Sequence, residues 1–146
     1  MKNHFKEIFL KNLDSLAAEL SAYTDENHIW ELRSGISNCA GNLALHLIGN
    51  LNHFIGSQLG NTGYVREREK EFGDKDVSRD VLVEKITATK KMIQIAFDNL
   101  RENDLQKQFP LTHFGEAKTT HEVLLILLTH FNYHLGQVNY HRRLIN

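Results

Sequence analysis

Apolar side chains recur at steps of three and four residues along most of this chain, and that spacing belongs to α-helices that bury one face. The sequence has one proline in 146 residues, which suits long helix interiors, because proline removes a backbone hydrogen bond there. We therefore predict an all-α fold, an up-and-down antiparallel four-helix bundle that forms a single domain over residues 1–146. The four helices are expected at residues 4–23, from Ser37 or Asn38 to about Leu59, at 79–100, and from Thr119 to about Leu144.

Two of these helices have recognisable starting residues. Ser78 is suited to cap the third helix, because its hydroxyl can accept a backbone N–H. Thr119 and Glu122 have the spacing of a capping box, in which each side chain bonds the backbone of the other residue. The third helix also has a seam of small and apolar residues at alternating steps of four and three, which is typical of bundle packing. Its members are Leu82, Ile86, Thr89, Ile93, Ala96 and Leu100.

Two long loops separate the later helices, at residues 60–77 and 101–118, where no long apolar period is present. A long link without secondary structure is uncommon inside a compact domain and is usually functional. Two interpretations of residues 60–77 are open, a solvated charge-rich loop or a segment that covers a substrate. In the second case Tyr64, Arg66 and Phe72 would fold over one end of the bundle.

Composition narrows the class of protein. The chain is 41% hydrophobic and 24% charged, with a net charge of −1, so nothing in its charge favours binding to nucleic acid or to an anionic membrane. The longest apolar run, Val123 to Leu128, is too short to span a bilayer, and no signal peptide is recognisable. The single cysteine, Cys39, excludes an intrachain disulfide and fits a reducing compartment. We expect a cytoplasmic protein that binds neither nucleic acid nor membrane.

Histidine is abundant, with nine residues, and three of them share one stripe of the last predicted helix with Gln137. Steps of four, seven and eleven return to nearly the same azimuth of a helix, so His130, His134, Gln137 and His141 line up. Neutral imidazole is a good ligand for zinc, nickel, copper or iron. His130 and His134 are separated by about 6 Å of helical rise and can share an ion, whereas His134 and His141 are about 10.5 Å apart.

A third ligand is expected from the second helix, where Asn42, His46 and His53 form another polar stripe. We choose His46 over His53, because it lies among apolar neighbours in the middle of the helix, where an unpaired imidazole would be costly to bury. An isolated pair of histidines one turn apart is more often without a metal, but this second stripe favours a site. His46, His130 and His134 would leave one coordination position open, as catalytic metal sites do. Candidates to contact the ligands or to line a pocket are Asn42, His53, Tyr64, Arg66, Gln137 and His141.

Two segments resemble a known family. Leu45-His-Leu-Ile-Gly-Asn-Leu51 and His130-Phe-Asn-Tyr-His-Leu-Gly-Gln137 are similar to the helix-two and helix-four motifs of the DinB-like family of bacterial four-helix metalloproteins. The resemblance maps the family's metal ligands onto His46, His130 and His134. It implies a bundle with one divalent metal ion, zinc or nickel in many members, and a homodimer. It also implies a small-molecule substrate, because some members are S-transferases or isomerases that use a low-molecular-weight thiol.

Three functions are compatible with these residues. The first is a metal-dependent thiol transferase acting on small electrophiles, with the electrophile near Asn42, Tyr64 or Arg66. The second is metal-assisted hydrolysis, which needs a general base, and neither histidine stripe carries a carboxylate. The third is a non-catalytic, stress-associated protein whose histidine cluster is structural. Cys39 precedes His46 by seven residues, about 10.5 Å of helical rise, so it is not expected to act as a nucleophile.

Overall fold

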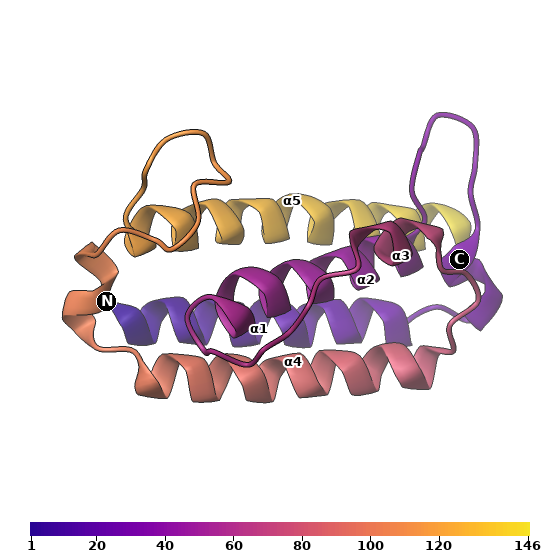
Figure 1. Ribbon diagram of the computed structural model, residues 1–146. Helices are drawn as coiled ribbons and strands as arrows, with labels where there is room; N and C mark the ends of the chain where they lie inside the picture. Colours follow the sequence, from indigo (N-terminus) through magenta and orange to yellow (C-terminus); the bar gives the residue numbers. More distant parts are fainter.

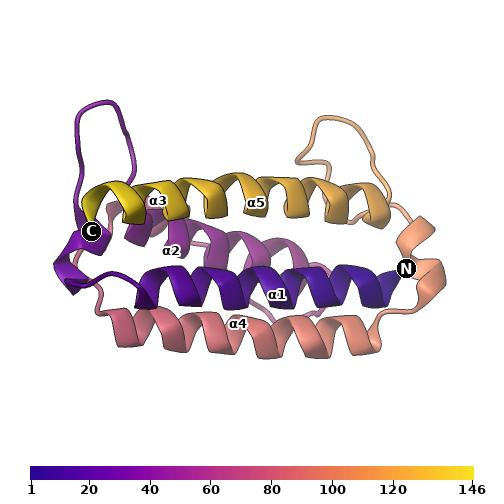
Figure 2. The same cartoon turned by 180° about the vertical axis from the view of Figure 1, so that it is seen from behind.

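The fold is all-helical, as predicted, and the computed structural model describes all 146 residues. Four long helices lie side by side along the molecule (Figures 1 and 2), and a fifth, short helix lies beside α2. Two 3₁₀ helices, Glu26–Trp30 and Glu102–Gln106, lie in the connections, and α2 continues into a π-helical turn, Asn52–Ser57. The α-helices are α1 (Lys2–Ser21), α2 (Ala40–Leu51), α3 (Arg68–Gly73), α4 (Arg79–Asn99) and α5 (Thr120–Ile145).

Side-chain caps fix the starts of α4 and α5. Ser78 Oγ accepts the Val81 N–H at 3.3 Å, and Thr119 forms the predicted capping box with Glu122. The predicted start of the second helix at Ser37 or Asn38 is wrong, because α2 begins at Ala40 after Cys39. The Cys39 side chain makes no capping bond, since its thiol donates to Asn42 Oδ1 at 3.0 Å instead.

The directions of the helices differ from the predicted up-and-down order. Neighbours α2 and α4 run in the same direction, since Asn52 contacts Thr89 and, further along both elements, Gly60 lies against Ala96. Helices α1 and α5 also run in the same direction, whereas α1 is antiparallel to α4 and α2 to α5 (Figure 1). A strictly antiparallel order is therefore wrong.

The connection after α2 explains this order. It returns along the length of the molecule and brings the start of α4 back to the start of α2 (Figure 1). At its far end Trp30 Nε1 donates to Val77 O at 3.1 Å. An extended chain covers about 3.3 Å per residue, so roughly ten residues suffice to cross the length of a 21-residue helix.

The core is one cluster of 30 buried residues contributed by all four long helices. The predicted seam of α4 faces it together with an apolar seam of α1, and burial of each large apolar side chain there stabilises the fold by about 1.5–3 kcal/mol. None of the helices combines the length and the hydrophobicity that crossing a bilayer requires. The seam residues are Phe5, Phe9, Leu13, Leu16 and Leu20 from α1 and Leu82, Ile86, Thr89, Ile93 and Ala96 from α4.

Residues 60–77 are not simply a solvated loop. They contain α3, and α3 packs against α2. Asn42 Nδ2 anchors the end of α3 by donating to the backbone carbonyls of Glu71 at 3.0 Å and Asp74 at 2.8 Å. The side chain of Glu71 is buried, with 5% of its surface exposed. This segment therefore delivers a carboxylate into the protein interior beside α2.

Candidate metal centre

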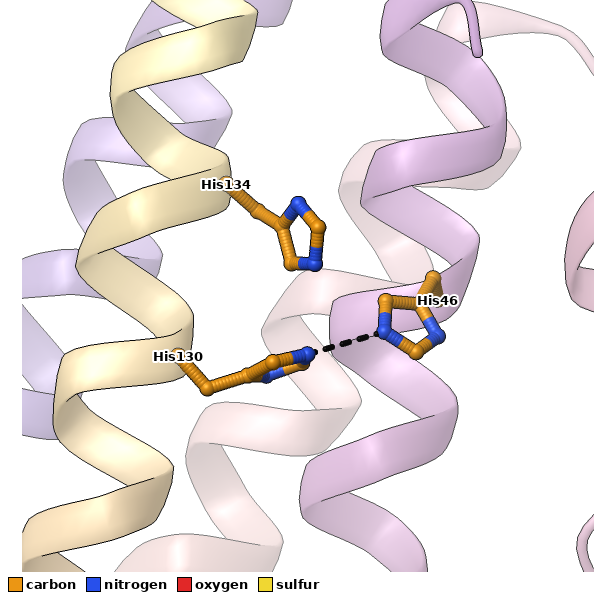
Figure 3. A group of neighbouring side chains, drawn as sticks. All are labelled: His46, His130 and His134. Carbon is orange, nitrogen blue, oxygen red and sulfur yellow. Dashed lines mark hydrogen bonds between the residues drawn. The ribbon is translucent and has the colours of Figure 1, made fainter. Parts of the chain in front are cut away.

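Three imidazoles from α2 and α5 converge on one point between the helices (Figure 3). His46 comes from α2, and His130 and His134 come from successive turns of α5. Each offers one ring nitrogen, and these three atoms lie within 4.8 Å of one another. His46 Nε2 and His130 Nε2 are 3.0 Å apart. Two nitrogens bound to one tetrahedral zinc ion would be about 3.3 Å apart, so the His46–His130 pair is already close to that spacing.

The protonation of the cluster suits a cation. The pKa of His130 is lowered to about 4, chiefly by burial and also by the neighbouring His134 and His46. Burial also lowers the pKa of His134, against a hydrogen bond with Gln137 that raises it. Both imidazoles are therefore neutral at pH 7, and a neutral imidazole is the form that ligates a metal.

Hydrogen bonds on the outer ring nitrogens orient two of the three histidines. His46 Nδ1 lies 2.9 Å from Glu71 Oε1, and His134 Nδ1 lies 2.6 Å from Gln137 Oε1. Both oxygens are acceptors, so we assign the Nδ1 proton to each histidine. Each Nε2 then presents a lone pair to the centre of the cluster. Outer contacts of this kind fix the tautomer and strengthen the ligand in metal sites.

His130 is held differently. Its Nδ1 is buried without a hydrogen-bond partner, and its Nε2 faces His46 Nε2. Because the proton of His46 is on Nδ1, the short contact requires that His130 Nε2–H donates to His46 Nε2. To bind a metal ion through Nε2, His130 would carry its proton on Nδ1 instead. The donor set and its geometry can therefore hold a metal ion.

Glu71 is the site residue that sequence reasoning missed. Its carboxylate also pairs with Arg66, whose Nε donates to Oε2 and whose Nη2 donates to Oε1, each at 2.9 Å. Burial raises the pKa of Glu71, but the hydrogen bonds and charges of His46 and Arg66 together lower it below its ordinary value. The alternating acidic and basic residues at 66–72 indicate ion pairs within this segment. The segment contains three glutamates, and the sequence does not show which of them approaches the histidines.

The remaining predicted residues have separate positions. Asn42 supports α3 rather than the histidines, and His53 packs its ring against Phe54 outside the cluster. Tyr64 lies by a small pocket that Glu71 also lines. His141 is buried, where Tyr23 Oη donates to its Nδ1 at 2.6 Å and its Nε2 donates to Glu31 O. Of the six candidates, two are linked to the cluster: Gln137 contacts His134 directly, and Arg66 pairs with Glu71, which contacts His46.

A larger pocket of about 510 Å³ adjoins the cluster at Gln137. Residues 33–38 form one wall, and the last turns of α5 form the other, including Tyr140 and Leu144. Leu43, one turn before His46, also lines this pocket. The same glutamine thus contacts a candidate metal ligand and lines a space large enough for a small molecule.

The fold and the cluster together define an all-helical protein with a three-histidine group that can hold a metal ion. Comparison with family models gives a more particular assignment. The family model described as "Protein of unknown function (DUF1572)" matches residues 3–146, and the chain belongs to that family. A comparison with curated proteins found no match.

Proposed function

We propose that this chain is a divalent-metal protein in which His46, His130 and His134 are the three protein ligands. The observation that carries the proposal is the convergence of one ring nitrogen from each of the three histidines. In His46 and His134 the other ring nitrogen is hydrogen-bonded, to Glu71 and Gln137 respectively. Zinc and nickel are the metals we favour, because both accept imidazole ligands. Three protein ligands leave a position for a small molecule, as in catalytic zinc sites.

We further propose that the protein is DinB-like, a single-domain four-helix bundle located in the cytoplasm and functioning as a homodimer. The pair of motifs on α2 and α5 and the shared core of the four long helices support this assignment.

The activity we propose is transfer of a low-molecular-weight thiol to a small electrophile. A bound divalent ion would supply the activation, since a coordinated thiol loses its proton. A carbon–sulfur bond would form as the bond from that carbon to the halide or epoxide oxygen breaks and its electron pair goes to the halide or oxygen. The thiol proton would pass to solvent or to the opened alkoxide. The pocket beside Gln137 is the best place for the electrophile, because Asn42 and Arg66 are already engaged with α3 and Glu71.

The chain itself offers no competing nucleophile at the cluster. Cys39 is fully buried at the start of α2, and its thiol donates to Asn42 Oδ1. The sulfur that reacts would therefore have to come from a cosubstrate.

Cobalt substitution tests the proposed activity. The Co²⁺-loaded protein is titrated with 2-mercaptoethanol and with cysteine, and thiolate coordination is read from a sulfur-to-cobalt charge-transfer band. Turnover is then assayed with an aryl halide and an epoxide on the zinc-loaded protein. The proposal expects the band and thiol-dependent product formation. Full metal occupancy with neither the band nor turnover for any thiol would contradict it.

Hydrolysis is the second candidate, because the structure brings one carboxylate, Glu71, to the cluster. That carboxylate is not free to act as a general base, since both of its oxygens accept hydrogen bonds from Arg66 and one also accepts from His46. Hydrolysis therefore ranks below thiol transfer. A non-catalytic role for the cluster is the outcome if metal binds without either reaction.

A further inference from the structure

We infer that Glu71 is a positioning residue of this centre, which orients His46 from behind, and that Gly49 is the gap in α2 that admits its carboxylate. The inference rests on the proposed metal site, because orientation of His46 matters most when its Nε2 binds an ion. It assigns a role to the connection between α2 and α4 that helix packing alone does not require.

The space at Gly49 carries the first part of the inference. Gly49 lies three residues after His46, so the two positions share a face of α2. A Cβ at Gly49 would overlap Glu71 Oε2 and lie 2.6 Å from Glu71 Cδ. Any larger residue would therefore displace the end of the Glu71 side chain. The three atoms nearest to that Cβ all belong to Glu71.

The hydrogen bond to His46 carries the second part. Both a donor and an acceptor approach His46 Nδ1, with Glu71 Oε1 at 2.9 Å and Arg66 Nη2 at 3.4 Å. The carboxylate is closer and cannot donate, so it determines that Nδ1 carries the proton. Phe72, the next residue of α3, packs its ring 4.8 Å from the His46 ring and limits its rotation. The same short helix therefore sets both the tautomer and the orientation of His46.

Arg66 stabilises the buried Glu71 carboxylate and keeps both of its oxygens hydrogen-bonded. An unpaired carboxylate would be costly at 5% exposure, and the bidentate guanidinium offsets that cost. The three histidines are consequently unequal, since His46 has a carboxylate behind it, His134 an amide, and His130 no partner. Loss of Glu71 should weaken the site through His46 alone.

The Glu71→Gln variant tests this role, because an amide has only one acceptor oxygen. If that oxygen takes the place of Oε2 and accepts from Arg66 Nε, the amide NH₂ faces His46 Nδ1, and the His46 proton moves to Nε2, where it blocks ligation. We expect zinc affinity to fall by about 10–100-fold, as for loss of other outer contacts. The Glu69→Gln variant is the matched control, since Glu69 lies on the same helix, is exposed and makes no ion pair.

Three measurements give the result: competition of zinc with a chromophoric chelator, the d–d spectrum of the cobalt form, and the ¹⁵N shifts of the His46 ring without metal. We expect weaker binding, an altered spectrum and a changed His46 tautomer in Glu71→Gln, with Glu69→Gln unchanged. Equal affinity, spectrum and tautomer in Glu71→Gln and the unmodified protein would overturn the inference.

The unmodified protein gives an independent test if Glu71→Gln does not fold. Its metal-free ¹⁵N spectrum should show the His46 proton on Nδ1, and a proton on Nε2 instead would overturn the role of Glu71. This result does not depend on metal binding. If neither zinc nor cobalt binds the unmodified protein, the proposed function fails, while the tautomer still decides the orientation by Glu71.

Discussion

Replacing Gly49 with alanine changes a single hydrogen into a methyl group, and its consequences follow from one contact. The new Cβ would overlap Glu71 Oε2 and lie 2.6 Å from Cδ and 3.2 Å from Cγ. The end of the Glu71 side chain must therefore move, and its hydrogen bond to His46 is lost. Zinc affinity should fall by about 10–100-fold, which corresponds to about 1.4–2.7 kcal/mol.

Stability should respond with two opposing terms. Alanine in a helix interior is favoured over glycine by about 1 kcal/mol. The lost charged hydrogen bond to His46 costs about 1.5–3 kcal/mol, so the metal-free variant should be destabilised by roughly 0.5–2 kcal/mol. In a Glu71→Ala background the overlap is absent, and Gly49→Ala should then stabilise the protein by about 1 kcal/mol.

Urea unfolding of the four proteins of this cycle gives the stabilities, and chelator competition gives the zinc affinities. The reversal of sign between the two backgrounds is the signature of the Gly49–Glu71 contact. A Gly49→Ala protein that is more stable than the unmodified protein and binds zinc equally well would refute the reasoning.

Three further predictions address the ligands and their surroundings. His134→Ala should weaken zinc binding by more than the roughly 10–100-fold expected for an outer contact, whereas His53→Ala should not change it, as chelator competition would show. Zinc affinity should fall on acidification, because the histidine ligands must be neutral to bind the ion. The pKa of His130 is about 4 and that of His134 is lowered, so protons should compete at these two ligands only below the usual histidine pKa of about 6.5. Titrations of zinc affinity from pH 8 to 4.5 would show this. Tyr23→Phe leaves buried His141 Nδ1 without its donor and should cost about 1–3 kcal/mol in urea unfolding without altering zinc affinity.

Periodicity predicted the helices well because it reports burial of one face, and residues 82–96 of the predicted α4 seam are buried as expected. Helical rise was equally informative for the histidines. The one-turn separation of His130 and His134 is a local property of any helix. The structure places both residues beside His46, as predicted. That they bind a metal remains a prediction.

Other features depend on tertiary structure that no local pattern encodes. The apolar period of α4 is the same in either direction, so it could not indicate that α4 runs parallel to α2. Glu71 was missed for a related reason, since its role depends on where residues 60–77 return along α2. The requirement for glycine at position 49 could not be predicted either, because it depends on the Glu71 carboxylate that lies against it. His141 likewise shares the stripe of His134 but contacts Tyr23, which follows the C-terminal end of α1.

The metal content of the protein purified without a histidine tag tests the central claim most directly. Elemental mass spectrometry should give a ratio near one divalent ion per chain, as isolated or after dialysis against zinc or nickel. The protein with His46, His130 and His134 all replaced by alanine should give a ratio near zero under the same treatment. A ratio near zero for the unmodified protein, not restored by dialysis against either metal, would contradict the account.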